Sequence, residues 1–337
     1  MWYNNHEMSD IMKKILTGLK PTGDLTLGNY IGAIKQMKDL EDKFESYLFV
    51  ADLHALTTHQ DPNELRERIK RFVGMYIACG VSPDKHMIYI QSENEFIPAI
   101  SWILECNTYY GEASRMIQFK EKSKENANFT VGLLTYPILM AADILYCDAD
   151  YVPVGIDQKQ HVEIARDIAE RFNKKYGEVF NLPDFYPIES GEKIYDLKDP
   201  SKKMSKTEEN PTGVISLFDS PEDAKKKIMK ATTDSLGIVK YDPENQAGIS
   251  NLLTIASVLE NKTISDIEKE FVGIGYGDFK KYVGDVVANF LSEIQAKYDD
   301  IIRSDELNNI LDKGIEKSRA LAKEKYEKLK KLVGVER

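Results

Sequence analysis

Cysteine is scarce in this sequence of 337 residues, and the spacing of the cysteines argues against both a disulfide-bonded fold and a zinc-stabilised fold. The three cysteines, Cys79, Cys106 and Cys147, lie far apart, and none belongs to a C-x-x-C pair. A disulfide framework needs paired cysteines and a structural zinc site needs closely spaced ligands, so neither is expected. The histidines show no metal-ligand spacing either. We therefore expect no metal site built by side chains alone, and a protein of the reducing cytoplasm.

Positive charge is in deficit, because 45 lysines and arginines face 55 aspartates and glutamates, for a formal net charge of −10. This balance opposes wholesale wrapping of a polyanion, although a local patch of lysines can still bind phosphates. Tracts rich in Gly, Ser or Pro are absent, so disorder is not expected. The first ten residues lack the basic and then apolar order of an export signal. We expect neither DNA nor a membrane as a partner.

Long apolar runs are also lacking, apart from residues 129–147, which approach the length of a membrane span. Pro137 and Asp143 interrupt this run, so a buried core segment that carries one polar group is the better interpretation. A buried carboxylate needs a hydrogen-bond donor. Three interactions remain open for Asp143: a salt bridge, a helix cap and a hydrogen bond from a ligand N–H.

Short apolar runs alternate with helical patterns in the first part of the chain. The expected strands are residues 15–17, 47–51, 87–90 and 151–154. Between the second and third, an amphipathic helix is expected to end at Gly80. This alternation favours an α/β fold with a Rossmann-like, doubly wound parallel sheet. Ligands collect at the carboxyl ends of such strands, so residues 18–29, 52–54 and 155–158 are expected to converge.

Strand patterns fade after Pro211, and helical patterns continue to the end of the chain. Ser220 followed by Pro221 is typical of a helix start. We predict a Rossmann-like domain over residues 12–210 and an α-helical domain with a C-terminal helix over 211–337. A capping box between Asp157 and Gln160 is predicted to begin the helix after the fourth strand.

Two loops could bind phosphate. Glycines at positions 18, 23 and 28 allow the backbone to approach a ligand closely after the first strand, although such a loop is often only a tight turn. The second loop, residues 202–207, places Lys203 and Lys206 on either side of a small hydroxyl residue. Two such cations could close on a triphosphate, and a solvated linker is the alternative.

Thr26-Leu27-Gly28-Asn29 resembles a variant of the first signature of class I aminoacyl-tRNA synthetases, and residues 203–207 (KMSKT) resemble their second signature. Within that class, several segments are similar to those of tryptophanyl-tRNA synthetases. These are residues 28–32 (GNYIG), 133–137 (LLTYP), 140–145 (MAADIL), 152–155 (VPVG) and 157–161 (DQKQH). The resemblance covers nearly the whole chain after Met12.

The resemblance implies roles for the matching positions. For ATP binding it indicates Lys20, Pro21, Thr22, Gly28, Asn29, Gly155, Ile156, Asp157, Ile194, Lys203, Met204, Ser205, Lys206 and Thr207. For the tryptophan pocket it indicates Leu16, Gly18, His54, Tyr136, Met140, Asp143, Val152, Val154 and Gln158. For catalysis it indicates Thr26, Asn29, Lys203 and Lys206. The chain departs from the family at Lys20, Ile156 and Thr207, which leaves their ATP contacts open, and His54 could instead be a core histidine.

The resemblance also implies a two-step reaction that consumes ATP with Mg²⁺. The carboxylate of L-tryptophan attacks the α-phosphorus of ATP and releases pyrophosphate, and the terminal ribose of tRNA(Trp) then attacks the aminoacyl adenylate. The family further implies a homodimer formed through the α/β domain, which we place within residues 92–128, and an anticodon-reading helical domain. Two alternatives remain open, a tyrosine-specific relative and a non-catalytic RNA-binding paralogue.

Overall fold

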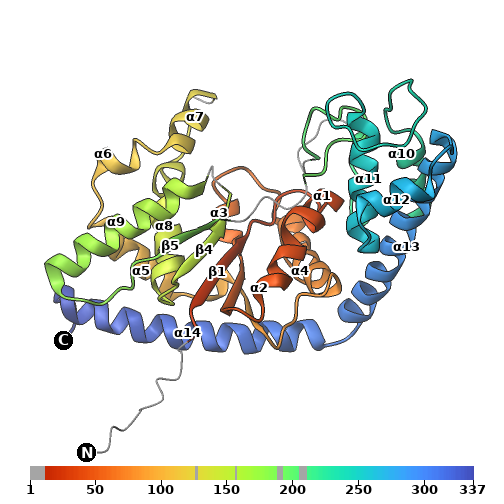
Figure 1. Ribbon diagram of the computed structural model, residues 1–337. Helices are drawn as coiled ribbons and strands as arrows, with labels where there is room; N and C mark the ends of the chain where they lie inside the picture. Colours follow the sequence, from red (N-terminus) through yellow and green to blue (C-terminus); the bar gives the residue numbers. More distant parts are fainter. Residues whose placement is uncertain (1–11, 126–127, 156–157, 188–192, 205–210) are drawn as a thin grey trace, which may run out of the picture.

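A computed structural model describes residues 12–125, 128–155, 158–187, 193–204 and 211–337 (Figure 1). Its centre is a parallel sheet in the order β3-β2-β1-β4-β5. The strands are β1 (Lys14–Leu19), β2 (Glu45–Val50), β3 (His86–Ile90), β4 (Tyr151–Val154) and β5 (Asp184–Pro187). The four predicted strands and the Rossmann-like sheet are confirmed. The short edge strand β5 was not predicted, because its side chains are exposed or half-buried and give no apolar run.

Helices cover both faces of the sheet because alternate strand residues point to opposite sides. Leu48 and Ile88 belong to one core, with the helices α1 (Leu27–Asn29), α2 (Lys35–Leu40) and α4 (Pro62–Ala78) and the π-helical turn Tyr30–Ile34. Tyr47 and Tyr89 belong to the other core, with α5 (Phe96–Glu105), α8 (Val131–Leu145) and α9 (Lys159–Tyr176). Three short helices, α3 (Asp52–Ala55), α6 (Tyr110–Ala113) and α7 (Ile117–Glu125), complete this part. The predicted helix end at Gly80 is confirmed, with φ of 98°.

The start of α9 leaves one prediction untested. Its N-cap is Gln158, whose side chain makes no capping hydrogen bond. The capping box predicted between Asp157 and Gln160 stays a prediction, because Asp157 lies outside the described residues. Gln160 also makes a tertiary contact, since its side-chain oxygen accepts the N–H of Ile117, at the start of α7, at 2.8 Å.

The chain after Pro211 is helical in the structure. It begins with the 3₁₀ turn Pro211–Gly213 and forms α10 (Pro221–Met229), α11 (Ala247–Glu260), α12 (Ile264–Glu270), α13 (Tyr276–Arg303) and α14 (Glu306–Val333). Ser220 caps α10 through Asp223 N–H, and Pro221 occupies its first turn, as predicted. Among the described helices, none is both long and apolar enough to span a bilayer.

Helix α14 leaves the other C-terminal helices and runs along the sheet (Figure 1), where it packs against β3 and α5. Gly314 permits this approach, because a Cβ at that position would lie 1.7 Å from the carbonyl oxygen of Ile88. Further along, the buried Lys325 donates to Asp148 and to the Val179 carbonyl, both at 2.7 Å. The last helix of the predicted 211–337 domain thus packs on the Rossmann-like part.

Candidate active site

A cavity of about 390 Å³ opens at the carboxyl ends of β1, β2 and β4. It lies where the strand order reverses, between β1 and β4, which is the usual ligand position in such sheets. The nine residues predicted for the tryptophan pocket all line it. The other lining residues are Lys20, Phe49, Ala51, Thr57, Gln118, Lys122 and Ile144. The expected convergence of segments 18–29, 52–54 and 155–158 is confirmed through Gly18, His54 and Gln158.

Asp143, from α8, is the buried charge of this cavity and is 0% exposed. Its Oδ2 lies 2.8 Å from His54 Nε2, and Gln91 Nε2 lies 2.9 Å from both carboxylate oxygens. Burial raises the pKa of Asp143, and the hydrogen bonds from His54 and Gln91 oppose that shift because they favour the charged form. The polar residue in the apolar run therefore has protein partners and also faces the cavity.

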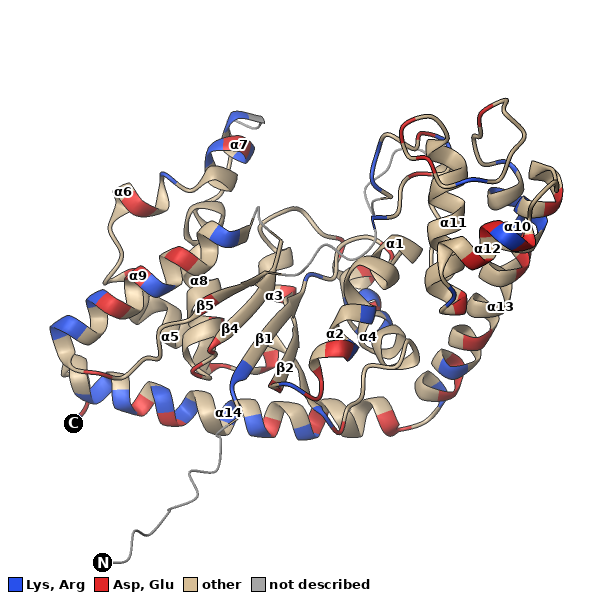
Figure 2. Cartoon of the chain, viewed as in Figure 1, with Lys and Arg blue, Asp and Glu red and all other residues tan. Residues whose placement is uncertain are grey.

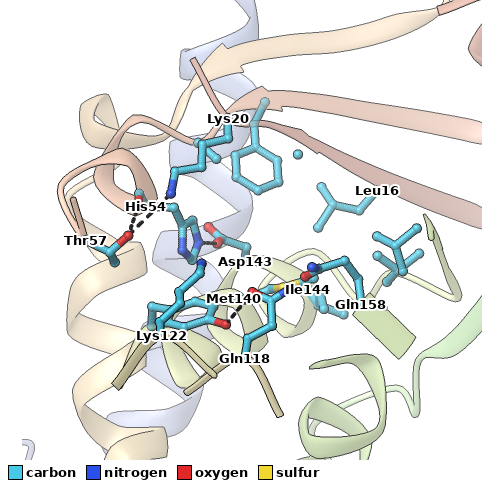
Figure 3. Close-up of a pocket in the computed structure, with 16 residues that line it drawn as sticks. Leu16, Lys20, His54, Thr57, Gln118, Lys122, Met140, Asp143, Ile144 and Gln158 are labelled. Atoms are coloured by element: carbon cyan, nitrogen blue, oxygen red, sulfur yellow. Dashed lines mark hydrogen bonds and ion pairs between the residues drawn. The ribbon is translucent and has the colours of Figure 1, made fainter. Parts of the chain in front are cut away.

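A second polar group of the cavity is Tyr136, which contacts Gln118, a residue labelled in Figure 3. The hydroxyl of Tyr136 is 3.0 Å from Gln118 Oε1 and 2.7 Å from His161 Nε2. Burial raises the pKa of Tyr136 to about 12, so the phenol is neutral at physiological pH. Gln118 lies on α7, a helix that no sequence motif marked, and sequence reasoning missed it for that reason.

Two lysines also face this cavity. Lys20 Nζ lies 3.4 Å from Thr57 Oγ1 (Figure 3), and Lys122 comes from α7, whose lysines appear blue in Figure 2. Burial, and secondly the charge of Lys122, lower the pKa of Lys20 because both disfavour the ammonium form. Neither lysine forms an ion pair with a carboxylate in the described part of the chain. An anionic ligand would supply the missing opposite charge.

A larger cavity, of about 940 Å³, adjoins the first and shares Gly18, Lys20, Val154 and Gln158 with it. Thr22 and Gly155, both predicted to bind ATP, also line this second cavity. Ile194 does not, because its side chain is 1% exposed and packs in the core. Five predicted positions, Ile156, Asp157, Ser205, Lys206 and Thr207, lie outside the described residues.

The first signature is built around a capping box. The Thr26 hydroxyl accepts the N–H of Asn29, and the Asn29 side chain in turn accepts the N–H of Thr26. Leu27 N–H donates to the carbonyl of Ile215 at 2.9 Å. Thr26 and Asn29, two of the four residues predicted to be catalytic, thus hold the start of α1 in place, and their catalytic role stays a prediction.

The two signature loops touch each other. A Cβ on Gly28 would lie 3.1 Å from the carbonyl oxygen of Met204, so glycine lets the second loop pack over the first. Met204 is buried and its N–H donates to Ile194, whereas Lys203 is exposed. Lys203 is therefore free to move toward a ligand while its neighbour anchors the loop.

Comparison with known proteins identifies the family. A family model described as class I tRNA synthetases (W and Y) matches residues 12–292. The tryptophan–tRNA ligase of Listeria monocytogenes is 47% identical over 327 residues, which span 97% of this chain and 99% of the relative. That of Bacillus subtilis is 47% identical over 323 residues, which span 96% of this chain and 98% of the relative.

A solved structure of the same family has the same fold. Tryptophanyl-tRNA synthetase from Campylobacter jejuni, complexed with ADP and tryptophan, superposes with a TM-score of 0.84 at 35% identity. The match spans 95% of this chain and 99% of that one. The chain therefore belongs to the tryptophan and tyrosine family of class I tRNA synthetases, in the group of the tryptophan–tRNA ligases.

Proposed function

We propose that this chain is a tryptophan–tRNA ligase, which forms tryptophanyl adenylate from L-tryptophan and ATP and transfers the tryptophanyl group to tRNA(Trp). One observation carries the proposal: an apolar cavity with a buried carboxylate, Asp143, adjoins a larger cavity that the loop after β1 lines with Lys20 and Thr22. The cavity walls suit the indole ring, and the carboxylate suits its N–H. A pocket built to hydrogen-bond one polar group rejects analogues that lack it.

The ammonium groups of Lys20 and Lys122 suit the place where the two substrates meet. Lys20 lines both cavities, so it can contact the tryptophan carboxylate or the α-phosphate of ATP. As the carboxylate attacks, negative charge moves onto the α-phosphate oxygens and the leaving pyrophosphate, and fixed cations stabilise it there. Lys203, with Lys206, would close over the pyrophosphate that leaves.

Mg²⁺ would arrive with ATP. Among the described residues, no three His, Cys, Asp or Glu side chains cluster as metal ligands. Mg²⁺ is commonly held by substrate phosphates and water with few protein carboxylates, which fits this donor set. The ion would supply further positive charge to the phosphates during the attack.

A homodimer is the second part of the proposal. Exposed apolar side chains lie within and next to residues 92–128, and α6 and α7 extend away from the sheet (Figure 1). They are Trp102, Tyr109, Tyr110, Ile117, Phe129 and Val131. Pairing two copies through this segment would cover these side chains. We assign anticodon binding to the helices α10 to α13 and place the enzyme in the cytoplasm.

ATP–pyrophosphate exchange tests the proposed reaction. Exchange should depend on L-tryptophan and be at least about 10³-fold slower with L-tyrosine or L-phenylalanine, because neither presents an indole N–H to Asp143. Charging of tRNA(Trp) should follow. Exchange that tyrosine supports best would indicate the tyrosine-specific alternative, and absence of exchange with every amino acid would indicate the non-catalytic one.

A further inference from the structure

Gln91 contacts Asp143 and, like Gln118, belongs to no motif that the sequence analysis marked. It is 0% exposed and begins the 3₁₀ turn η2 (Gln91–Glu93), directly after β3. The N–H of Leu53 donates to Gln91 Oε1 at 3.2 Å, so the oxygen of the amide must face Leu53. The NH₂ group therefore faces Asp143, at 2.9 Å from each carboxylate oxygen.

The turn that carries Gln91 is anchored at both ends. On one side, Asp52 Oδ1 accepts the N–H of Ser92 and that of Leu53, both at 3.0 Å. On the other side, Asn94 donates to Ser318 Oγ of α14 at 2.8 Å, and this contact is buried. The amide of Gln91 is thus held by backbone contacts and cannot easily follow a change in Asp143.

The contacts of Asp143 leave one acceptor position open. An ionised carboxylate has about four acceptor positions, two on each oxygen. Oδ2 accepts from both His54 and Gln91, whereas Oδ1 accepts from Gln91 in the described contacts. Asp143 lines the cavity, so a donor bound there could occupy the remaining position on Oδ1.

We propose that Gln91 is a positioning residue for amino-acid selection, which holds the Asp143 carboxylate so that Oδ1 accepts the N–H of a bound indole. The inference rests on the proposed tryptophan site. Without the amide, only His54 would hold a fully buried carboxylate. Such a group can rotate or take up a proton, and a protonated carboxyl is a poorer acceptor.

Gln91→Met tests the inference, because it keeps an unbranched side chain and removes both donors. The readout is kcat/KM in pyrophosphate exchange for L-tryptophan and for L-β-(3-benzothienyl)alanine, in which sulfur replaces the indole N–H. The wild type should prefer tryptophan by about 10- to 100-fold, the cost of an unmade bond to a buried charge. The variant should lose about tenfold of that preference, with kcat/KM for ATP changed less than about threefold.

A second variant gives a readout that a merely structural role would not move. Gln91→Glu places a second carboxyl against Asp143, and two such groups share a proton. The acid limb of kcat/KM for tryptophan should therefore move to higher pH. Gln295→Met is the matched control, since Gln295 Nε2 donates to the backbone carbonyls of Leu217 and Asp219 at 2.9 and 2.8 Å, and none of these residues lines the cavity. It should lower stability and leave the preference unchanged.

The outcomes separate this inference from the proposed function. A wild type that does not distinguish tryptophan from the sulfur analogue would overturn the indole contact itself. A wild type that distinguishes them, together with an unchanged preference in folded Gln91→Met and an unmoved acid limb in Gln91→Glu, would overturn the role of Gln91 alone. If Gln91→Met fails to fold, the pH profile of Gln91→Glu decides between these outcomes.

Discussion

Asp143 is a buried carboxylate that lines the cavity, so its proposed contact with the indole N–H can be tested by substitution. Asp143→Ala should lower kcat/KM for tryptophan by about 10²-fold, the loss of a hydrogen bond to a charged group, with a much smaller effect on ATP. Phenylalanine, which the wild type should reject by about 10⁴-fold, should be rejected far less by the variant. An unchanged ratio in a folded variant would mean that Asp143 only supports His54 and Gln91.

The protonation of Lys20 should make ATP binding depend on pH. Burial and Lys122 lower the pKa of Lys20, and only its protonated form can bind phosphate. The value of kcat/KM for ATP should therefore fall as pH rises through this lowered pKa, below the usual lysine value of about 10.4. Lys20→Arg stays protonated and should move the alkaline limb to higher pH, whereas Lys20→Gln should lower kcat/KM at pH values below this pKa and remove the limb. The same alkaline limb in Lys20→Arg and wild type would remove Lys20 from ATP binding.

At the level of elements, the contact between the two signature loops involves the backbone of Gly28 and Met204. Gly28→Ala would place a Cβ 3.1 Å from the carbonyl oxygen of Met204, so the loop that carries Lys203 must shift. Single-turnover adenylate formation should slow by about tenfold or more, because small displacements of reacting groups are costly. Gly32→Ala is the matched control, with nothing within 4 Å of its Cβ. Equal rates in both variants would show that the loops act independently.

At the scale of the whole molecule, α14 fastens the C-terminal end of the chain to the sheet. Gly314→Ala would bring a Cβ to 1.7 Å from the Ile88 carbonyl oxygen, so α14 would have to move away from β3. The free energy of unfolding should fall by about 1 to 3 kcal/mol or more in urea titration. Gly277→Ala on α13, where a Cβ meets nothing within 4 Å, should be neutral or slightly stabilising. A neutral Gly314→Ala would contradict the tight packing.

The same packing makes deletion of residues 211–337 a poor test of the helical domain. Such a deletion removes α14 from β3 and also α13 from α4, whose side chains share one hydrophobic core. The remaining fragment would expose that core and the edge of the sheet. Point substitutions in α10 to α13 are therefore the proper way to separate tRNA charging from amino-acid activation.

The proposed dimer can be tested through two exposed aromatic side chains. Trp102 is 67% exposed and Tyr110 is 74% exposed, and neither is needed for the folded core. Trp102→Glu with Tyr110→Glu should convert a dimer to a monomer in light scattering, because each buried charge would face an apolar surface. Thermal stability at low protein concentration should change little. A wild type that is monomeric at micromolar concentration would contradict the dimer.

Local sequence patterns predicted four of the five strands of the described sheet, the start of α10 and two candidate phosphate-binding loops. Apolar runs placed four strands, Ser220 with Pro221 placed the start of α10, and two signature loops placed the site between them. These signals are local because strand and helix preferences depend on neighbouring residues. The polar exception at Asp143 was visible for the same reason, but its partner was left open.

Only the tertiary structure decided which side chains meet. Gln91 and Asp143 are 52 residues apart, and Asn94 and Ser318 are 224 residues apart. The order of strands brings the ends of β2, β3 and β4 to one edge, so His54 and Gln91 reach Asp143 without any motif that joins them. The packing of α14 on β3 and the hydrogen bond from Ile117 to Gln160 are contacts of the same kind. Contacts between distant parts of the chain depend on the packing of the whole fold, which short-range sequence patterns do not encode.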